Sequence, residues 1–175
     1  GILRAGVNNA LSTTTAVTLA NTVGAGLDLN NFDLTIGSLA GGGTTTRGSV
    51  TLGSGTLTTG DDSNTTYAGV ISGTGSLVKA GTGTLTLTGA STYSGGTVID
   101  EGTISVGGNG NLGNALGQLT FGGGTLRITN GFASARDVTL NAGGGTFDTN
   151  GNNLTMSGDM TGAGGITKTG TGTLT

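Results

Sequence analysis

The sequence lacks four residue types altogether, because its 175 residues include no cysteine, proline, histidine or tryptophan. The missing cysteine excludes a disulfide framework and a thiolate metal site, and the missing histidine excludes a His-based catalytic triad or general base. The missing proline suits strands inside a hydrogen-bonded ladder, where every residue must supply its N–H. Only 3% of the residues are aromatic, so any hydrophobic core must be narrow.

Charge and long apolar runs are also scarce. The net charge is −3, with 9% charged residues and no basic cluster, which argues against nucleic acid as a partner. No run approaches the roughly 20 apolar residues that a membrane-spanning helix needs. The sequence contains no signal peptide, and it starts and stops inside repeated motifs. We therefore interpret it as a fragment whose targeting signals lie elsewhere.

Glycine, at 40 residues, and threonine dominate what is present. Such a composition is typical of low-complexity disorder, but the apolar residues recur in period-2 runs such as Thr84-Leu85-Thr86-Leu87-Thr88. This alternation places leucine inside and threonine outside, where a β-branched side chain suits an exposed pleated face. No segment has a helical period or helix caps. The pattern predicts an all-β protein without helices.

Short strands are expected along the whole chain. They fall at 16–19, 27–29, 34–36, 49–52, 56–58, 67–71, 77–79, 84–88, 97–99, 103–106, 119–121, 125–129, 137–140, 145–148, 154–156 and 165–168. Residues 41–46 are expected to form a Gly/Thr loop. Asn30-Asn31 is expected to form a corner, because asparagine tolerates left-handed backbone angles.

Parts of the sequence repeat one another. Residues 162–175 repeat residues 73–86 with a lysine, Lys79 or Lys168, in the same position. Residues 1–6 similarly match the segment that begins at Gly102. Internal repetition of this kind identifies architectures that stack one unit.

The offset between matched segments changes along the chain. It is 105 from Asn9 to Asn114, 121 from Ala16 to Asp137, and 89 from Gly73 to Gly162. We infer that the second copy gained about one strand pair, around residues 125–128, and lost the block around residues 38–69. A solenoid tolerates such changes because each turn contacts only its neighbours. At roughly 20 to 25 residues per turn, the sequence predicts a parallel β-solenoid of about eight coils.

Two tyrosines and two lysines invite a functional interpretation. Tyr67 and Tyr93 occupy similar contexts, and packing at a corner is favoured over ligand stacking. Strict alternation from Leu77 points Lys79 inward, which is costly for an unpaired charge. We therefore expect Lys79 to lie past the strand end with its ammonium in solvent. An isopeptide bond to an Asp or Asn is the minor alternative.

Catalytic and ligand-binding motifs are missing. Asp61-Asp62 and Asp100-Glu101 are carboxylate doublets, but adjacent strand residues point to opposite faces, so we interpret them as solvated turn residues. The calcium nonapeptide and the phosphate-binding loop do not occur. We expect no catalytic, cofactor-binding or metal-binding residues, no cofactor and no enzymatic activity.

A longer pattern covers residues 73–106. It reads G-x-G-x-L-x-K-x-G-x-G-T-L-T-L-x-G, then T-Y-S-G-G-T, then G-T-I-x-V. It resembles the passenger-associated transport repeat of bacterial autotransporters, which are type V secreted proteins. Ala90-Ser91 departs from the frequent asparagine, and Ile104 from the common leucine. The resemblance implies a right-handed parallel β-helix. Residues 1–175 would then be a single β-helix fragment of a longer passenger domain, with partial copies of the repeat at 1–6 and 162–175.

The resemblance also implies a location and partners. These are the Gram-negative cell surface or secreted fraction, on the extracellular side of the outer membrane, with the rest of the passenger and a C-terminal outer-membrane β-barrel in the parent chain. In that family the repeat is associated with passenger export and folding. We therefore expect a structural stalk segment of a surface adhesin or virulence factor.

Two other functions are weighed against the stalk. Exposed Thr, Asn and Tyr could bind a host-cell or matrix ligand directly, which is the main alternative. Ice binding, suggested by Thr56-Leu57-Thr58 and Thr84-Leu85-Thr86, is less favoured because these pairs are irregularly spaced. Strand edges at both ends of the fragment lead us to expect fraying or end-to-end self-association.

Overall fold

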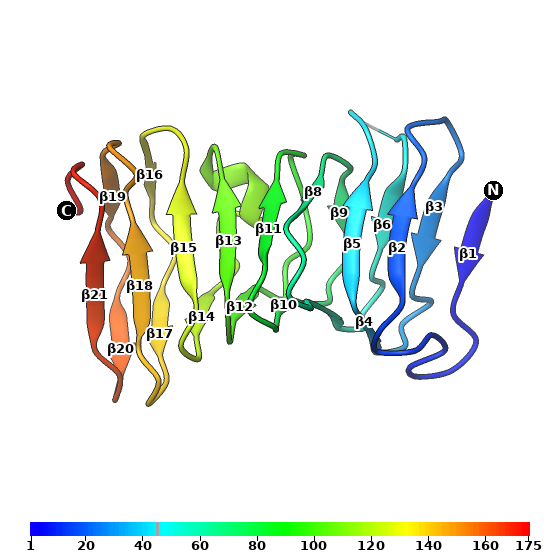
Figure 1. Ribbon diagram of the computed structural model, residues 1–175, viewed down its shortest axis with the longest axis horizontal. Coiled ribbons are helices and arrows are strands. Elements are labelled where there is room, and N and C mark those ends of the chain that lie inside the picture. The colour runs from blue at the N-terminus through cyan, green and yellow to red at the C-terminus, as the bar shows by residue number, and fades with distance from the viewer. Residues whose placement is uncertain (45) are drawn as a thin grey trace.

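The computed structural model describes residues 1–44 and 46–175 as a parallel β-solenoid of about eight turns (Figure 1). The two termini lie at opposite ends of the rod, and each turn visits three faces in the same order. The described residues include no α-helix and a single short 3-10 helix, η1 (Asn109–Leu112). None of their helices is long and apolar enough to cross a membrane. The predicted all-β parallel solenoid of about eight coils is confirmed.

Two of the three faces run without a break through the stack. Face 2 is a seven-stranded sheet made of β4 (Leu34–Ile36), β7 (Leu57–Thr59), β10 (Leu77–Lys79), β12 (Thr97–Ile99), β14 (Leu119–Phe121), β17 (Val138–Leu140) and β20 (Met160–Gly162). Face 3 is an eight-stranded sheet made of β2 (Ala16–Leu19), β5 (Ser38–Gly41), β8 (Thr65–Tyr67), β11 (Thr84–Leu87), β13 (Thr103–Val106), β15 (Thr125–Ile128), β18 (Gly145–Asp148) and β21 (Ile166–Thr169).

The third face is interrupted. Face 1 begins as a four-stranded sheet of β1 (Ile2–Arg4), β3 (Gly26–Asp28), β6 (Ser49–Thr51) and β9 (Ile71–Ser72). It resumes as a two-stranded sheet of β16 (Phe132–Ser134) and β19 (Leu154–Met156). We number the turns from the N-terminus, each beginning on face 1, so that turn 1 ends with β2 and turn 8 with β21. Turns 5 and 6 therefore have strands on faces 2 and 3 but none on face 1.

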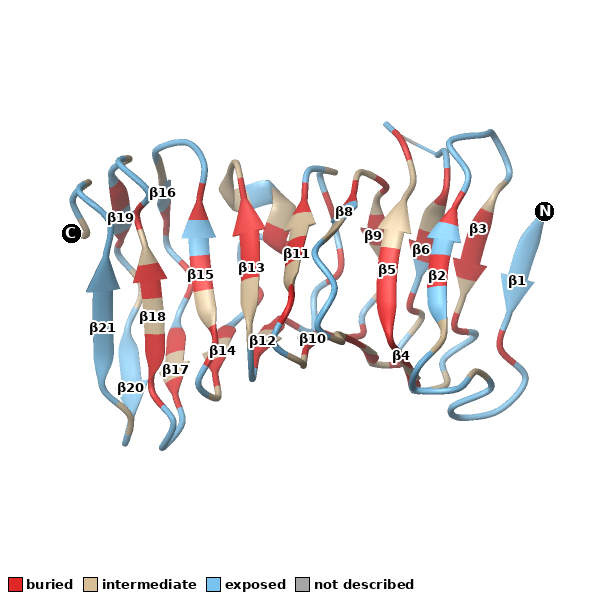
Figure 2. Ribbon diagram, viewed as in Figure 1, coloured by how far each residue is buried: buried red, intermediate tan, exposed pale blue. Residues whose placement is uncertain are grey.

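Rows of inward side chains form the narrow core. On face 2, Leu34, Leu57 and Leu77 pair in register on three successive turns, and all three are buried. Burying one such side chain contributes about 1.5–3 kcal/mol, so a row over many turns holds the stack together. Phe121 and Phe147 add a tilted ring contact with centroids 5.0 Å apart. Figure 2 shows buried positions along most of the rod, whereas β1, β20 and β21 at its ends are exposed.

The corners absorb differences in turn length. Register partners are 19 residues apart at Thr84 and Thr103, and 26 apart at Gly41 and Tyr67. Asn30 and Asn31 have φ values of 52° and 68°, so the predicted left-handed asparagine corner is confirmed. Strand pairing therefore stays in register while the corners between the strands vary in length.

Several predicted strand boundaries are wrong. The expected strand 67–71 is two strands, β8 and β9, because the chain turns a corner between them. β5, β16 and β20 were not expected; their sequences carry few large apolar residues, and pairing with neighbouring turns holds them in the ladder. β5 also takes Gly41 from the expected loop 41–46, of which Thr45 lies outside the described residues.

The structure places matched sequence segments on different faces. Lys79 ends β10 on face 2, whereas Lys168 lies in β21 on face 3. No strand separates Asn9 from Ala16, but β14, β15 and β16 separate the matching residues Asn114 and Asp137. Residues 9–16 cross face 2 without a strand, so that Val17 lies on face 3, whereas its match Val138 lies on face 2 of the following turn. The second copy therefore gained two faces of a turn, in agreement with the inferred gain of about one strand pair. The recurring unit is a corner with its strand, and it can occupy any face.

Candidate functional site

Lys79 is buried, and its expected position in solvent is wrong. Its side chain lies in the inward row of face 2, in register with Thr59 and Ile99, and is 2% exposed. The ammonium Nζ donates hydrogen bonds to the carbonyl oxygens of Ala80 and Gly81, the latter at 2.6 Å. These acceptors replace the water that burial removes. Lys79 can therefore point inward, as the alternation along the strand requires, without leaving its charge unpaired.

Two acidic residues from the neighbouring turns act on the same lysine. Burial lowers the pKa of Lys79 below its ordinary value, while Glu101 of turn 5 and Asp61 of turn 3 favour its charged form and offset part of this shift. A hydrogen bond from the backbone N–H of Ser63 lowers the pKa of the Asp61 carboxyl. One member of each carboxylate doublet, Asp61 and Glu101, thus lies at the same corner on either side of Lys79, and we call this group the lysine corner (Asp61, Lys79 and Glu101).

Lys168 repeats the geometry of Lys79 on another face. Its Nζ donates to the carbonyl oxygens of Thr169 and Gly170, at 3.4 and 2.8 Å, and to the hydroxyl of Thr149. Gly81 and Gly170 both have positive φ, 65° and 76°, which turns their carbonyls toward the lysine and favours glycine. Lys168 is exposed because it lies in the last described turn. The lysine is therefore part of a local corner motif.

In turn 5, tyrosine packing replaces the missing strand of face 1. Tyr93 is fully buried, and its hydroxyl lies 2.6 Å from the hydroxyl of Thr97. Single main-chain hydrogen bonds continue the stack, from Thr92 N to Ile71 O and from Asn114 N to Tyr93 O. Tyr67, also fully buried, donates from its hydroxyl to the Gly48 carbonyl. Both tyrosines are buried as packing residues rather than exposed for ligand stacking, as predicted, but Tyr93 packs on face 1 and not at a corner.

A buried arginine of turn 7 holds the irregular chain of turn 6. Residues 107–118, which we call the η1 segment, cross face 1 without a strand. Arg136, only 1% exposed, points its guanidinium under this segment. Nε donates to Asn109 Oδ1 at 2.8 Å, and Nη1 donates to the Asn114 and Gly117 carbonyls at 2.6 and 2.7 Å. Nη2 donates to the carbonyls of Asn109 and Gly113.

Arg136 thus uses all five N–H donors of its guanidinium on one irregular segment. A carbonyl buried without a partner costs about 1–3 kcal/mol, and no strand pairs with these carbonyls. The arginine supplies the missing donors, although burial lowers its pKa from the ordinary value. No role for Arg136 was predicted from the sequence. Its only signal was an arginine in place of an apolar residue beside the strand 137–140.

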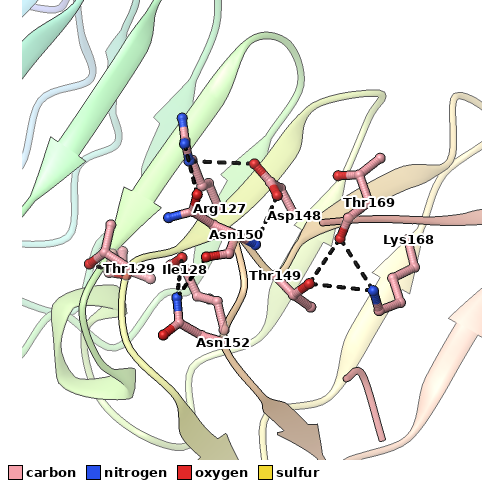
Figure 3. Close-up of polar contacts among 10 residues, drawn as sticks. Arg127, Ile128, Thr129, Asp148, Thr149, Asn150, Asn152, Lys168 and Thr169 are labelled. Carbon is pink, nitrogen blue, oxygen red and sulfur yellow. Dashed lines mark hydrogen bonds and ion pairs between the residues drawn. The ribbon is translucent and has the colours of Figure 1, made fainter. Parts of the chain in front are cut away.

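A polar surface follows the corner between faces 3 and 1. Figure 3 shows Arg127 of turn 6 reaching Asp148 of turn 7 at 3.4 Å and the side-chain oxygen of Asn150 at 3.0 Å. Asp148 in turn accepts a hydrogen bond from the backbone N–H of Asn150. Asn152 also joins adjacent turns through the carbonyl of Ile128. Such half-exposed contacts contribute little individually, but they fix the corner's side chains.

A groove interrupts this polar corner where turn 5 supplies glycine. Val106 pairs with Leu87 and Ile128, so Gly107 lies between Thr88 of turn 4 and Thr129 of turn 6. A groove of about 480 Å³, which we call the Gly107 groove, opens over this glycine, and its lining carries no charge. It is lined by Thr86, Leu87, Thr88, Ala90, Gly107, Gly108, Gly110, Asn111, Thr129 and Asn130.

Threonine is regularly arrayed on face 3, despite its irregular spacing in the sequence. One row consists of Thr84, Thr103, Thr125, Thr146 and Thr167, in register on five successive turns. In the adjacent row, serine and charged side chains interrupt the threonines; its members are Thr66, Thr86, Ser105, Arg127, Asp148 and Thr169. The other pair considered for ice binding, around Leu57, lies on face 2. Among the described residues, face 3 therefore lacks the two aligned threonine rows of an ice-binding array.

No residue was predicted to bind a metal or a cofactor. Among the described residues, no group of three or more Asp, Glu, His or Cys side chains could hold a metal ion. The lysine corner contains two carboxylates with a buried ammonium between the turns that carry them. The arrangement is suited to joining turns.

Comparisons with known proteins agree with this architecture. The passenger-associated-transport-repeat family matches residues 77–106. The adhesin autotransporter BmaC of Brucella suis biovar 1 (strain 1330) is 42% identical over 158 residues, which cover 83% of this chain and 5% of that protein. The chain thus spans a small part of the length of this relative. No solved structure matches it significantly.

The relationship implies a cell-surface or secreted bacterial protein, and the solenoid and its adhesin relative indicate a structural or adhesive role. The family match spans turns 4 and 5, where β9 ends the first part of face 1 and Tyr93 takes over. Together with the alignment to an adhesin passenger over most of its length, this makes the chain a segment of an autotransporter passenger that carries a passenger-associated transport repeat.

Proposed function

We propose that this segment is a stalk of an autotransporter passenger, which helps the passenger fold during export and displays other regions. The observation that carries the proposal is the continuity of faces 2 and 3 through the transport repeat, where face 1 has no strand. Each new turn finds a preformed edge on two faces, so the stack can grow turn by turn. The proposal includes no enzymatic activity.

The parent protein is proposed to lie at the Gram-negative outer membrane, with a C-terminal β-barrel that anchors or exports the passenger. This extends the resemblance of residues 73–106 and the relationship to BmaC. Direct adhesion by the segment itself is the second candidate, because the Gly107 groove and the threonine row on face 3 present polar groups on a fixed surface.

Two deletions in the surface-displayed parent passenger separate these roles. Residues 77–118 form two whole turns, since Leu77 and Leu119 occupy equivalent positions on face 2. Removing them deletes the repeat without shifting the register. Residues 34–76 also form two whole turns and provide a matched control of nearly equal length that leaves residues 77–106, which the family model matches, intact.

We expect the deletion of 77–118 to reduce the amount of passenger at the cell surface several-fold, and the control deletion to have little effect. Adhesion per displayed molecule should remain unchanged. Equal surface amounts for both deletions would contradict a role in export. A loss of adhesion per molecule, confined to the 77–118 deletion, would favour the adhesive role instead.

A further inference from the structure

We propose that the Gly107 groove binds a neutral oligosaccharide. The groove lies at the corner between faces 3 and 1, next to the η1 segment. It is a property of the folded stack, because its walls come from turns 4, 5 and 6. The inference goes beyond the stalk function, which does not require a ligand.

Three polar atoms surround the space above Gly107. A Cβ at this glycine would lie 3.2 Å from Asn130 Nδ2, 3.4 Å from Thr129 Oγ1 and 3.9 Å from Asn111 Oδ1. The backbone of Gly107 lies outside the left-handed region, so its conformation does not require glycine. The glycine keeps open a small space that has an amide donor and two oxygen acceptors around it.

The free polar groups of the groove match a polyhydroxylated ligand. The side-chain amide of Asn130 and the hydroxyls of Thr86 and Thr88 make no hydrogen bond to any described residue. Amides and hydroxyls each supply donors and acceptors, as the hydroxyl groups of a sugar require. No charged side chain lines the groove, so it offers no counter-charge to a sulfated or carboxylated glycan.

The walls of the groove are held in place before any ligand arrives. Asn111 donates from Nδ2 to the Gly89 carbonyl at 3.0 Å, and its Oδ1 accepts from the Gly107 N–H at 3.1 Å. Arg136 holds the rest of the η1 segment through its five hydrogen bonds. Preorganisation of this kind reduces the entropic cost of binding. Arg136 is thus a positioning residue for the groove.

An oligosaccharide fits this surface better than a peptide. Protein partners are usually anchored by buried aromatic or large apolar side chains, and no aromatic residue lines the groove. A second depression of about 380 Å³ continues along the corner and shares Thr88 and Ala90 with the first. The combined path follows the long axis of the solenoid, as a chain of sugar units would. Without an aromatic platform we expect a Kd of about 1 mM, which repeated display on a cell surface can compensate.

The test is a titration of the isotope-labelled 175-residue chain, followed through its backbone amide resonances. The probes are neutral tetrasaccharides derived from mannan, galactan and glucan, with a heparin tetrasaccharide and a collagen-type peptide as comparators. At least one neutral tetrasaccharide should shift the amides of Gly107, Gly108 and Asn111. Gly107→Val, which fills the space, should weaken that binding at least tenfold, and Asn130→Ala should weaken it about threefold.

Gly165→Val is the matched control, because a Cβ there meets nothing within 4 Å and the site is far along the rod. It should leave binding unchanged. Asn130→Ala should fold normally, because Asn130 is exposed and forms no hydrogen bond with any described residue. The proposal is overturned if no neutral tetrasaccharide shifts the groove at 10 mM (about tenfold above the expected Kd), if only heparin or the peptide binds, or if Gly107→Val folds and binds like the wild type.

Discussion

Turns 3 and 6 satisfy the hydrogen-bonding groups of their main chain in two different ways. Turn 3 has a strand on every face, β6, β7 and β8, and its main-chain groups pair with the turns on either side. Turn 6 has strands only on faces 2 and 3, and Arg136 satisfies the carbonyls of the η1 segment on face 1. A solenoid can therefore omit a strand when one buried side chain supplies the missing donors. The irregular segment also lines part of the Gly107 groove, through Gly108, Gly110 and Asn111.

The largest expected effect comes from removing that side chain. Arg136→Ala leaves the carbonyls of Asn109, Gly113 and Gly117 without their donor, and we expect the free energy of unfolding to fall by about 3 kcal/mol. Urea denaturation measures the loss, and amide exchange should accelerate first in residues 107–118. If the loss is below about 1 kcal/mol and exchange in this segment is unchanged, turn 6 does not depend on Arg136.

The lysine corner tests whether a buried charge also stabilises a turn that has a strand on every face. Lys79→Met removes the donor to the Ala80 and Gly81 carbonyls, and we expect a loss of about 2 kcal/mol at neutral pH. Lys168→Met, at the exposed copy of the motif, should cost less than about 0.5 kcal/mol. Equal effects of the two substitutions, measured by urea denaturation, would show that burial does not matter here.

The lysine corner should also respond to pH. The pKa of Lys79 is lowered from its ordinary value of 10.5, mainly by burial. The unfolded chain therefore holds this proton more strongly, and the contribution of Lys79 to the free energy of unfolding rises with pH in the window just below 10.5. This rise should be absent from Lys79→Met. A parallel pH profile for the two proteins would contradict the assignment.

Tyr93→Phe should have an intermediate effect on stability, and the pH dependence of the Tyr93 contribution is opposite in sign to that of Lys79. Tyr93→Phe loses the hydrogen bond to Thr97 and should cost about 1 kcal/mol. Burial raises the pKa of Tyr93 from 10.0 to about 12, so its stabilising contribution is present below pH 10 and is lost as the pH rises toward 12. Between pH 10 and about 12, Tyr93→Phe should therefore lose less of its neutral-pH free energy of unfolding than the wild type does. Burial also raises the pKa of Tyr67, so part of the alkaline loss should remain.

The smallest effect is expected at the exposed Arg127 of turn 6. Arg127→Ala removes the 3.4 Å ion pair with Asp148 and a hydrogen bond to Asn150, both half-exposed. We expect a change of at most about 0.5 kcal/mol, further reduced by salt. This variant is the control for Arg136→Ala. A loss as large as that of Arg136→Ala would mean that turn 6 depends on arginine charge rather than on buried donors.

The period-2 runs were sufficient to predict most strands of faces 2 and 3. Residues 77–79, 97–99 and 119–121 are strands with the predicted bounds, because an inward leucine or isoleucine marks each one. β5 and β16 were missed since their neighbours, rather than their own side chains, decide their pairing. The groove could not be predicted, because Thr88 and Thr129 become neighbours of Gly107 only when three turns are stacked.

The sequence alone determined the unit of construction. Alternating small strands, glycine corners and the absence of proline specify local pairing, and the repeat at 73–106 identified the autotransporter passenger. Only the tertiary structure decided which face each unit occupies, since that depends on the summed lengths of all preceding corners. It also decided which charged side chains are buried. Lys79 and Arg136 are buried because carbonyls from distant or turning main chain satisfy them, and such acceptors are not visible in the residues beside them.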